Sequence, residues 1–412
     1  MRASVVRFGG LAALPFLSLL IPFLALPVIA RVATTQEWAA LGIGESLGAI
    51  VAIVVGYGWP LVGPARVASA HIDDARGHLV VSTSSRMLVF VLISVPAGVV
   101  AAALSPDGGQ ALGVLSFVST AILGLSPAWF LIGRGDPRAL AIYETIPRIA
   151  AGLAAILLVL ATGQVLWYPI LMIAVTAGFQ VLFAARHGAS IVLTRLEPWR
   201  MGLTQLRMDW SPAVAVLAGG AYSAATVALV STVGSVAVVA IFVSADKLLK
   251  ASLTAIVSAA NALQGWVAEP DESGPMRRRG YRGLGILAGV GFVGALGISL
   301  FGPLATQILF GLDLAIDTPT ALSVGVAFLA IALNTAIGRL LLVPMGAVRW
   351  VTWSTIAGAV IGVPTIIAAT AAFGVHGAAL AFAASEVLVV TVQAGALVSI
   401  TLRRPVDDPE AQ

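Results

Sequence analysis

Residues 243–252 read V-S-A-D-K-L-L-K-A-S, and this stretch decides how the chain must fold. Asp246, Lys247 and Lys250 follow the apolar run 236–242 directly, and these two lysines are the only ones in the chain. A charged side chain at the centre of a bilayer costs about 2.5–3.5 kcal/mol on insertion scales. An acid and two ammonium groups inside an apolar helix therefore indicate a dedicated structural or functional role.

The composition places this stretch in a membrane protein. The chain has 412 residues, of which 59% are hydrophobic and 10% charged, with a mean hydropathy of +1.01. A soluble domain of this size would lack enough polar surface to face water. The apolar run 8–30 is too long for the core of a signal peptide, so we interpret it as a first membrane span. Cysteine is absent, which excludes disulfide and thiol chemistry.

Apolar runs of roughly twenty residues, the length that crosses about 30 Å, predict an all-α polytopic protein with about twelve spans. The predicted spans are residues 9–30, 41–63, 86–104, 111–132, 146–163, 165–185, 212–233, 236–264, 284–310, 320–343, 351–373 and 377–401.

The arginines orient these spans. With a cytoplasmic N-terminus, twenty arginines fall in inner loops or at inner helix ends, and Arg31 alone lies outside. This bias predicts that both termini are cytoplasmic. A single span over residues 212–243 is rejected, because it would put the lysines outside and leave too little chain to return Arg277–Arg279 to the inside. Because the arginines serve short loops, the net charge of +4 does not indicate a nucleic-acid partner.

The chain also repeats itself weakly. An offset of 201 residues lays Glu45 over Asp246 and Arg76 over Arg277. This predicts two pseudo-symmetric six-helix lobes around a central polar cavity, a common plan for transporters. The predicted parts are an N-terminal lobe, a cytoplasmic amphipathic connector that mixes arginines with Leu196, Trp199 and Leu203, a C-terminal lobe and a cytoplasmic tail. Their boundaries are residues 1–185, 186–209, 210–402 and 403–412.

Helical geometry explains the opening stretch. At about 100° per residue, seven polar residues of the eighth span share one stripe about a third of the circumference wide and about 27 Å long. They are Asp246, Lys247, Lys250, Thr254, Ser258, Asn261 and Gln264. Such a face cannot lie against lipid, so it lines a wet cavity or packs on polar partners. Alternatively, Asp246 and Lys250 form an i,i+4 ion pair with a structural role only, but this interpretation does not account for Lys247. The surplus of positive charge points to an anionic substrate.

Five segments resemble the Wzx-type polysaccharide flippases, members of the multidrug/oligosaccharidyl-lipid/polysaccharide exporter (MOP) superfamily, and together they extend over nearly the whole chain. The segments are A-R-V-A-T-T-Q-E-W-A-A-L-G-I-G-E-S-L (30–47), G-Y-G-W-P-L-V-G-P-A-R-V-A (56–68), S-P-A-W-F-L-I-G-R-G-D-P (126–137), S-A-D-K-L-L-K (244–250) and G-V-H-G-A-A-L-A-F-A-A-S-E (374–386). The resemblance implies two six-helix lobes in a bacterial cytoplasmic membrane. It further implies a substrate of polyprenyl-diphosphate-linked oligosaccharide that moves from the inner to the outer leaflet by alternating access. The predicted helix number differs from the fourteen usual in the lipid II flippase branch, which argues against a role in peptidoglycan.

The resemblance also assigns residues. Lys247 occupies the place of a basic residue on helix eight that faces the cavity in relatives, and Arg31 matches an arginine that commonly ends helix one. The expected substrate-binding residues of the cavity are Lys247, Lys250, Asp246, Arg31, Thr254, Ser258 and Asn261. The expected partners are the lipid-linked oligosaccharide, membrane lipids, and the polysaccharide polymerase and glycosyltransferases of the same pathway. No enzymatic activity, cofactor or metal is expected.

The energy source stays open at this point. The chain has no G-x-x-x-x-G-K-[ST] motif with which to bind ATP. An ion gradient, the membrane potential or removal of product would have to drive transport. Asp246, Glu45 and Glu386 are the membrane-embedded acids that could carry a coupling proton. For Glu45 and Glu386, structural hydrogen bonding explains the sequence equally well.

Two other functions compete with the flippase. A drug or cation antiporter of the same superfamily would share the fold but should favour acids in its cavity. A membrane polysaccharide polymerase or ligase would share the pathway but should carry a large outer catalytic loop. The predicted outer connections 31–40, 105–110 and 311–319 are too short for such a loop.

Overall fold

The computed structural model describes residues 25–268 and 276–403. These residues form helices joined by short turns, without any strand, as the all-α prediction requires. Eight helices of this described part are long and apolar enough to cross a membrane. The chain divides into two compact units, one formed by the described residues up to Val243 with Gln307–Leu314, the other by Ser244–Thr306 with the described residues from Ala315 on.

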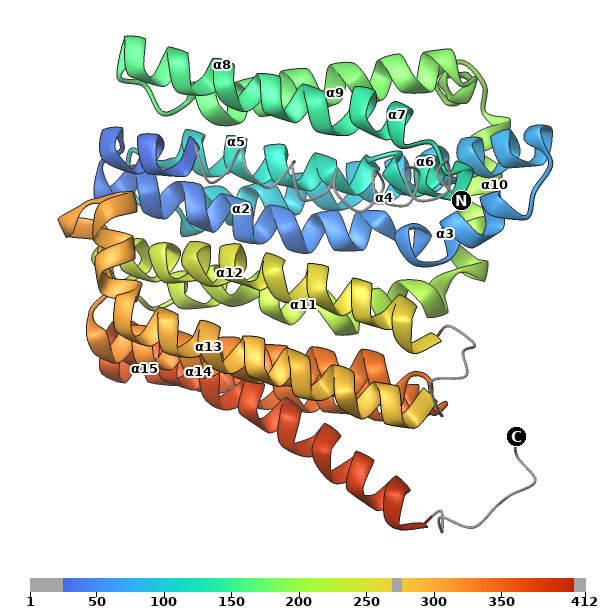
Figure 1. The fold of residues 1–412 in the computed structure, drawn as a ribbon. Helices are drawn as coiled ribbons and strands as arrows, with labels where there is room; N and C mark the ends of the chain where they lie inside the picture. Colours follow the sequence, from blue (N-terminus) through green and yellow to red (C-terminus); the bar gives the residue numbers. More distant parts are fainter. Residues whose placement is uncertain (1–24, 269–275, 404–412) are drawn as a thin grey trace. The chain divides into compact units, whose positions relative to one another are not determined.

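The first unit begins with helical residues 25–32 and contains most of the labelled helices (Figure 1). Its elements are α2 (Thr35–Gly56), α3 (Trp59–Ala68), α4 (Ile72–Leu104), α5 (Gln110–Ala121), η1 (Ile122–Leu125), α6 (Ala128–Arg134), α7 (Pro137–Leu140), η2 (Ala141–Thr145), α8 (Ile146–Thr162), α9 (Trp167–Arg186), η3 (Ala189–Leu193), α10 (Glu197–Met208), α11 (Trp210–Ser231) and the start of α12 (Val236–Ala268).

Small residues hold the centre of this unit together. Helices α2 and α5 pack at close range, and a Cβ added to Gly44 would lie 2.1 Å from the carbonyl oxygen of Gly113. A Cβ on Gly48 would similarly come within 2.5 Å of the Phe117 carbonyl oxygen. Lipid provides no hydrophobic drive between helices, so this close contact between backbones is what stabilises the pair.

The second unit contains the rest of α12 and the C-terminal helices. Its other elements are α13 (Met276–Phe310, whose last turn belongs to the first unit), α14 (Thr318–Ala336), η5 (Ile337–Leu342) and α15 (Val348–Arg403). Gly374, with φ of 61° and ψ of −138°, breaks α15 into two helical parts. This break falls between the predicted spans 351–373 and 377–401.

The helices agree with the predicted spans in number and order, apart from the span 9–30, most of which lies outside the described residues. Residues 212–243 do not form a single span, because α11 ends at Ser231 and α12 begins at Val236. Several helices are longer than predicted, and α4 begins at Ile72 instead of residue 86. Arg86 is therefore a buried residue inside α4, where it donates hydrogen bonds to the carbonyl oxygens of Gly124 and Ser126, and not a helix-end anchor.

The predicted lobe boundaries differ from the compact units. The prediction separates the lobes around a connector at 186–209, whereas the compact units divide inside α12, between Val243 and Ser244. Residues 210–243 therefore belong with the first unit by their contacts. The division into two repeated lobes of six helices stays a prediction.

Candidate functional site

The polar stripe of α12 is exposed over part of its length, and Asp246 within it is buried. With Asp246 taken as 0°, the buried residues Ala245, Leu249, Ile256 and Ala260 cluster near about 260–320°. The exposed polar residues Lys250, Ser258 and Asn261 fall at about 40–120° instead. The helix thus packs by its apolar side and presents the stripe outward.

Asp246 and Lys250 form the centre of this stripe. The Nζ of Lys250 lies 2.8 Å from Oδ2 of Asp246, and the two side chains are 43% and 7% exposed, respectively. Asp246 is ten residues after the start of α12, about 15 Å along the axis. In the predicted topology this is near the middle of a bilayer. The pair therefore lies at the depth where uncompensated charge would cost most.

The remaining predicted residues of the stripe extend toward the end of α12. Lys247 and Thr254 are half-buried, and Ser258 is exposed. Thr254 donates a hydrogen bond from Oγ1 to the carbonyl oxygen of Lys250 at 3.3 Å. Such a bond to the preceding turn satisfies the hydroxyl proton and leaves its oxygen lone pairs available.

The structure adds Arg339, a residue that the sequence analysis assigned only to an inner helix end. Arg339 is exposed on η5, and its Nη1 donates to Oδ1 of Asn261 at 3.0 Å. Asn261 lies about 16 Å along the axis from Lys250. The stripe thus has one cationic end at Arg339 and a second cationic region at Lys247 and Lys250. Arg339 could have been found from the sequence, because it is a charge inside the predicted span 320–343.

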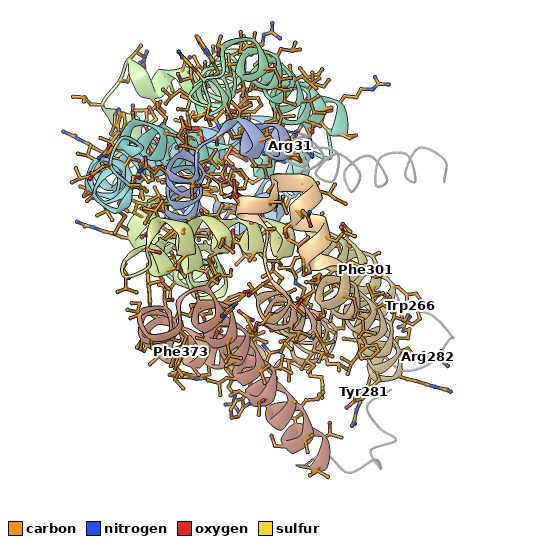
Figure 2. All side chains as sticks on the ribbon, turned by 90° about the vertical axis from the view of Figure 1, so that its left-hand side faces the viewer. Arg31, Trp266, Tyr281, Arg282, Phe301 and Phe373 are labelled. Carbon is orange, nitrogen blue, oxygen red and sulfur yellow. The ribbon has the colours of Figure 1, made fainter. Side chains whose placement is uncertain are left out.

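Arg31 lies in the first unit and has a structural partner there. Its Nη2 donates to the carbonyl oxygen of Ile308 at 2.6 Å, and Figure 2 shows the side chain at the end of the first helix. Ile308 belongs to the last turn of α13, whose carbonyl groups lack partners within the helix. A cation at this end also complements the helix dipole. The structure therefore gives Arg31 a capping role, and its assignment to the cavity stays a prediction.

The acids considered for ion coupling lie in different units. Glu45 is half-buried in α2, next to Ser46, whose hydroxyl donates to the carbonyl oxygen of Ala224 at 2.6 Å. Glu386 is 5% exposed in α15 and makes no hydrogen bond or ion pair with the residues that the structure describes. The sequence analysis missed a polar network on that helix, in which Gln393 donates to Asn334 at 2.8 Å and to Ser354 at 3.0 Å.

No protein-family profile and no curated protein matches the sequence. Solved structures do match. The lipid II flippase MurJ in an inward closed conformation superposes with a TM-score of 0.73 at 10% identity, over 97% of this chain and 93% of that one. An inward-facing multidrug resistance MATE family transporter of the MOP superfamily gives 0.61 at 16% identity, over 95% and 99%. The eukaryotic MATE transporter AtDTX14 gives 0.59 at 13% identity, over 95% of both chains.

At these identities the likeness concerns the fold and leaves the substrate open. It extends over nearly all of each chain and not over one lobe alone. The fold that the resemblance to flippases implies is thereby confirmed. This chain is a multi-pass, all-helical membrane protein with the fold that MurJ and the MATE transporters share.

Proposed function

We propose that the protein is a flippase that moves a polyprenyl-diphosphate-linked oligosaccharide from the inner to the outer leaflet of a bacterial cytoplasmic membrane. The observation that supports this proposal most strongly is the cationic polar face of α12. Along this face and the adjoining η5, three cations accompany one carboxylate: Lys247, Lys250 and Arg339 with Asp246. A diphosphate is an anion that cannot cross the hydrocarbon region without such groups.

The arrangement supports a stepwise path for the diphosphate. In the predicted orientation, Arg339 and Asn261 lie at the cytoplasmic end of the stripe, where a substrate would enter. Lys247 and Lys250 lie about 16 Å further along α12, near the membrane centre. Arginine and lysine both bind phosphate by charge-assisted hydrogen bonds, which are about twice as strong as neutral ones. The exposed hydroxyl of Ser258 and the side chain of Thr254 lie between these positions and would contact sugar or phosphate oxygens.

Alternating access would carry the substrate across, with both termini of the chain in the cytoplasm. The prenyl tail would stay in lipid while the diphosphate and sugars follow the polar face. Asp246, Glu45 and Glu386 are the candidates for coupling to an ion gradient, and Asp246 is the one that contacts a proposed substrate-binding lysine. The polymerase and glycosyltransferases of the same pathway would be the functional partners.

A drug or cation antiporter is the second candidate, because two of the structures above are MATE transporters with the same fold. The sign of the charge argues against it. A cationic drug would meet Lys247, Lys250 and Arg339 on this face, and like charges repel it. A polymerase or ligase is disfavoured because the outer connections among the described residues are short, as at 105–109 and 232–235.

The test replaces the two lysines together and Arg339 separately, and it measures two properties. Lys247→Gln/Lys250→Gln, Lys247→Arg/Lys250→Arg and Arg339→Gln would be expressed in a strain that lacks its own flippase. Export of lipid-linked oligosaccharide and membrane abundance would be measured for each. Binding of undecaprenyl diphosphate to the purified variants would be measured by native mass spectrometry. Arg282→Gln is the matched control, since Arg282 is an exposed cation that points away from the second unit (Figure 2).

We expect the double glutamine variant to lose most of its export and its binding of undecaprenyl diphosphate. The loss of one charge-assisted contact costs about 2–3 kcal/mol, or roughly a factor of 30–150 in occupancy. The double arginine variant should retain part of both, and Arg282→Gln should resemble the unaltered protein. Full export by the double glutamine variant at normal abundance would refute the electrostatic mechanism.

A further inference from the structure

A groove of about 340 Å³ lies in the first unit. It is lined by Val81 of α4 and by Arg200, Met201, Thr204 and Gln205 of α10. Helix α10 packs closely along α4, because a Cβ added to Gly202 would come within 2.8 Å of the Ser84 hydroxyl and the Ser85 backbone nitrogen. The groove is therefore formed by two helices whose spacing is fixed by a glycine contact.

The position of α10 relative to the membrane follows from its neighbours in the chain. It follows α9, which is long and apolar enough to cross a membrane, and precedes α11, whose residues Gly220–Ser231 are apolar. The predicted topology therefore puts α10 at the inner membrane surface. With Leu196 as 0°, Arg200, Leu203 and Arg207 all lie within about 40° of it, and Leu196 and Leu203 are 79% and 53% exposed. This exposed face thus carries leucines, which favour contact with acyl chains, and arginines, whose charged ends can reach anionic headgroups.

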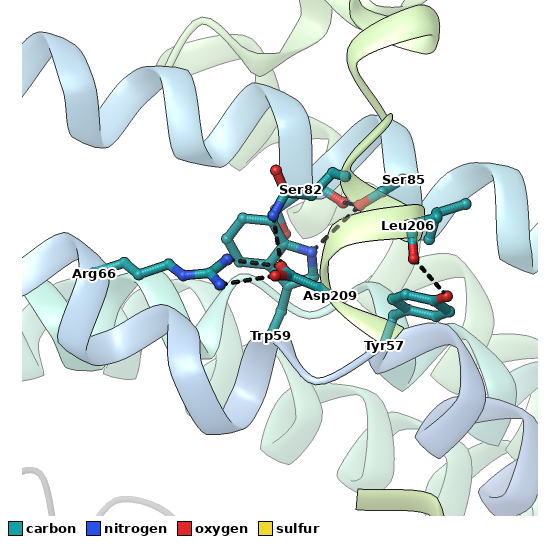
Figure 3. A network of polar contacts seen from close by, with 8 residues as sticks. Tyr57, Trp59, Arg66, Ser82, Ser85, Leu206 and Asp209 are labelled. Atoms are coloured by element: carbon teal, nitrogen blue, oxygen red, sulfur yellow. Dashed lines mark hydrogen bonds and ion pairs between the residues drawn. The ribbon is translucent and has the colours of Figure 1, made fainter. Parts of the chain in front are cut away.

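Polar contacts hold α10 firmly in this place (Figure 3). The hydroxyl of Tyr57 donates to the carbonyl oxygen of Leu206 at 2.9 Å. Asp209, directly after α10, accepts two hydrogen bonds from the Arg66 guanidinium at 2.7 and 2.8 Å. Gln205, which lines the groove, also donates to Asp209, at 2.6 Å. The groove wall is thus anchored to α3, and its shape does not depend on a ligand.

Arg200 is the cation that this groove offers. Its guanidinium makes no hydrogen bond or ion pair with any residue in the described part of the chain. Thr204 lies one turn further on and donates to the Arg200 carbonyl oxygen at 3.1 Å, which leaves its oxygen and the guanidinium on the same flank of the helix. Val81 and Met201 provide the apolar part of the lining.

We propose that this groove binds the headgroup of an anionic glycerophospholipid from the adjoining leaflet. Arg200 would bind the phosphate through its planar fork of donors, a geometry that lysine cannot reproduce. Thr204 and Gln205 would contact the glycerol hydroxyls, and Met201 with Val81 would contact the first methylenes of the acyl chain. The volume is within the range of small-molecule sites, about 300–1,000 Å³.

A lipid fits this site better than a soluble phosphate ester. The groove combines one cation with apolar side chains, and it lies on a helix that the chain itself fixes at the membrane surface. Because Gln205 also contacts Asp209, an occupant of the groove would reinforce the junction of α3, α10 and α11. A ligand that binds only the folded state raises the melting temperature. Binding can therefore be measured without any transport assay.

The experiment uses the purified full-length protein in a neutral detergent. Its melting temperature would be followed while phosphatidylglycerol, phosphatidylcholine or sn-glycerol 3-phosphate is added, and bound lipid would be counted by native mass spectrometry. The variants are Arg200→Gln and Arg207→Gln. They remove the same charge from the same exposed face of α10, but only Arg200 lines the groove.

We expect phosphatidylglycerol to stabilise the unaltered protein and Arg207→Gln similarly, with little effect of the other two compounds. Arg200→Gln should bind phosphatidylglycerol about ten- to a hundredfold more weakly, as expected for the loss of a charge-assisted contact. An equal response of Arg200→Gln and the unaltered protein would overturn the proposal. If Arg200→Gln and Arg207→Gln weaken the binding of phosphatidylglycerol equally, the lipid is attracted to the charged surface and not to the groove. If sn-glycerol 3-phosphate raises the melting temperature as much as phosphatidylglycerol does, the groove binds a soluble anion and not a lipid.

Discussion

Lys250 and Asp246 lie one helical turn apart on α12, and the Lys250 Nζ lies 2.8 Å from Oδ2 of Asp246. The carboxylate is 7% exposed and the lysine side chain 43% exposed, so the two partners occupy very different surroundings. The acid is held by the protein, whereas the ammonium group stays accessible from one side. Asp246 therefore orients Lys250 without enclosing it, and the pair remains available to a phosphate.

The first prediction concerns this carboxylate. Asp246→Asn should make the site more cationic, so binding of undecaprenyl diphosphate should become about fivefold tighter, corresponding to about 1 kcal/mol for a partly exposed pair. Export should slow, because release becomes harder. Asp246→Glu is the control that keeps the charge. If transport by Asp246→Asn instead loses its dependence on an imposed pH gradient, the carboxylate carries a coupling proton.

The second prediction tests whether the stripe faces water. The chain has no cysteine, so single cysteines can be introduced without background. Cysteines at Thr254 and Asn261 should react quickly with small water-soluble thiol reagents. Cysteines at Leu249 and Ile256 should react slowly, because both positions are buried.

A third position makes this comparison stricter. Leu157 of α8 is 68% exposed in the structure but lies on an apolar helix face with Leu153 and Leu160, so lipid should cover it. Leu157→Cys should react as slowly as the buried controls although it is more exposed. Rapid reaction at Leu157, or equal rates at Asn261 and Ile256, would mean that exposure in the structure does not distinguish a wet face from a lipid face.

The third prediction concerns orientation. Gly108 marks an outer turn but has a φ of 81°, which a cysteine tolerates poorly, so the neighbouring exposed Asp107 is the better labelling position. Asp107→Cys should label from outside in intact cells. Thr194→Cys, in the connector, should label only after the membrane is permeabilised. The opposite pattern would invert the topology. Arg339 and Asn261 would then lie at the outer end of the stripe, where a substrate from the cytoplasm could not enter.

The sequence predicted the helices well because apolar length and arginine placement are properties of the chain itself. The break between α11 and α12 is an example, since only a break at 232–235 could satisfy the charges on both sides. The stripe was also predictable, because a helical wheel depends on spacing alone. Arg339 could be recognised as a charge inside the predicted span 320–343, but its contact with Asn261 could not, because it joins residues 78 positions apart.

The same limit applies to Arg31 and to the connector. The resemblance to flippases placed Arg31 in the cavity, but the structure shows it donating to the carbonyl oxygen of Ile308, far along the chain. The amphipathic pattern of the connector predicted its position at the surface. It could not reveal the groove beside Arg200, because that groove needs Val81 and the close contact of Gly202 with α4.

The last prediction concerns the Arg66–Asp209 pair, which joins α3 to the end of α10. The hydrogen bonds from Arg66, with a smaller contribution from Gln205, hold the pKa of Asp209 below its ordinary value of 3.8, although burial acts in the opposite direction. A carboxyl whose folded-state pKa is lowered stabilises the fold above its unfolded pKa and loses that contribution as the pH falls through the folded value. The contact should therefore be fully present from neutral pH down to about pH 5.

Asp209→Asn should lower the free energy of unfolding at pH 7 by about 2–3 kcal/mol, because it leaves the partly buried Arg66 without its charged partner. The double variant Arg66→Gln/Asp209→Asn should recover part of this loss, since it removes the unpaired charge as well. Melting curves at pH 7 and pH 3 provide the measurement. The difference in stability between the unaltered protein and Asp209→Asn should be smaller at pH 3. At that pH the Asp209 carboxyl of the unfolded chain is mostly protonated, so its lowered pKa in the folded state contributes less stability. A difference that is equally large at both values would mean that shape, and not charge, holds this junction.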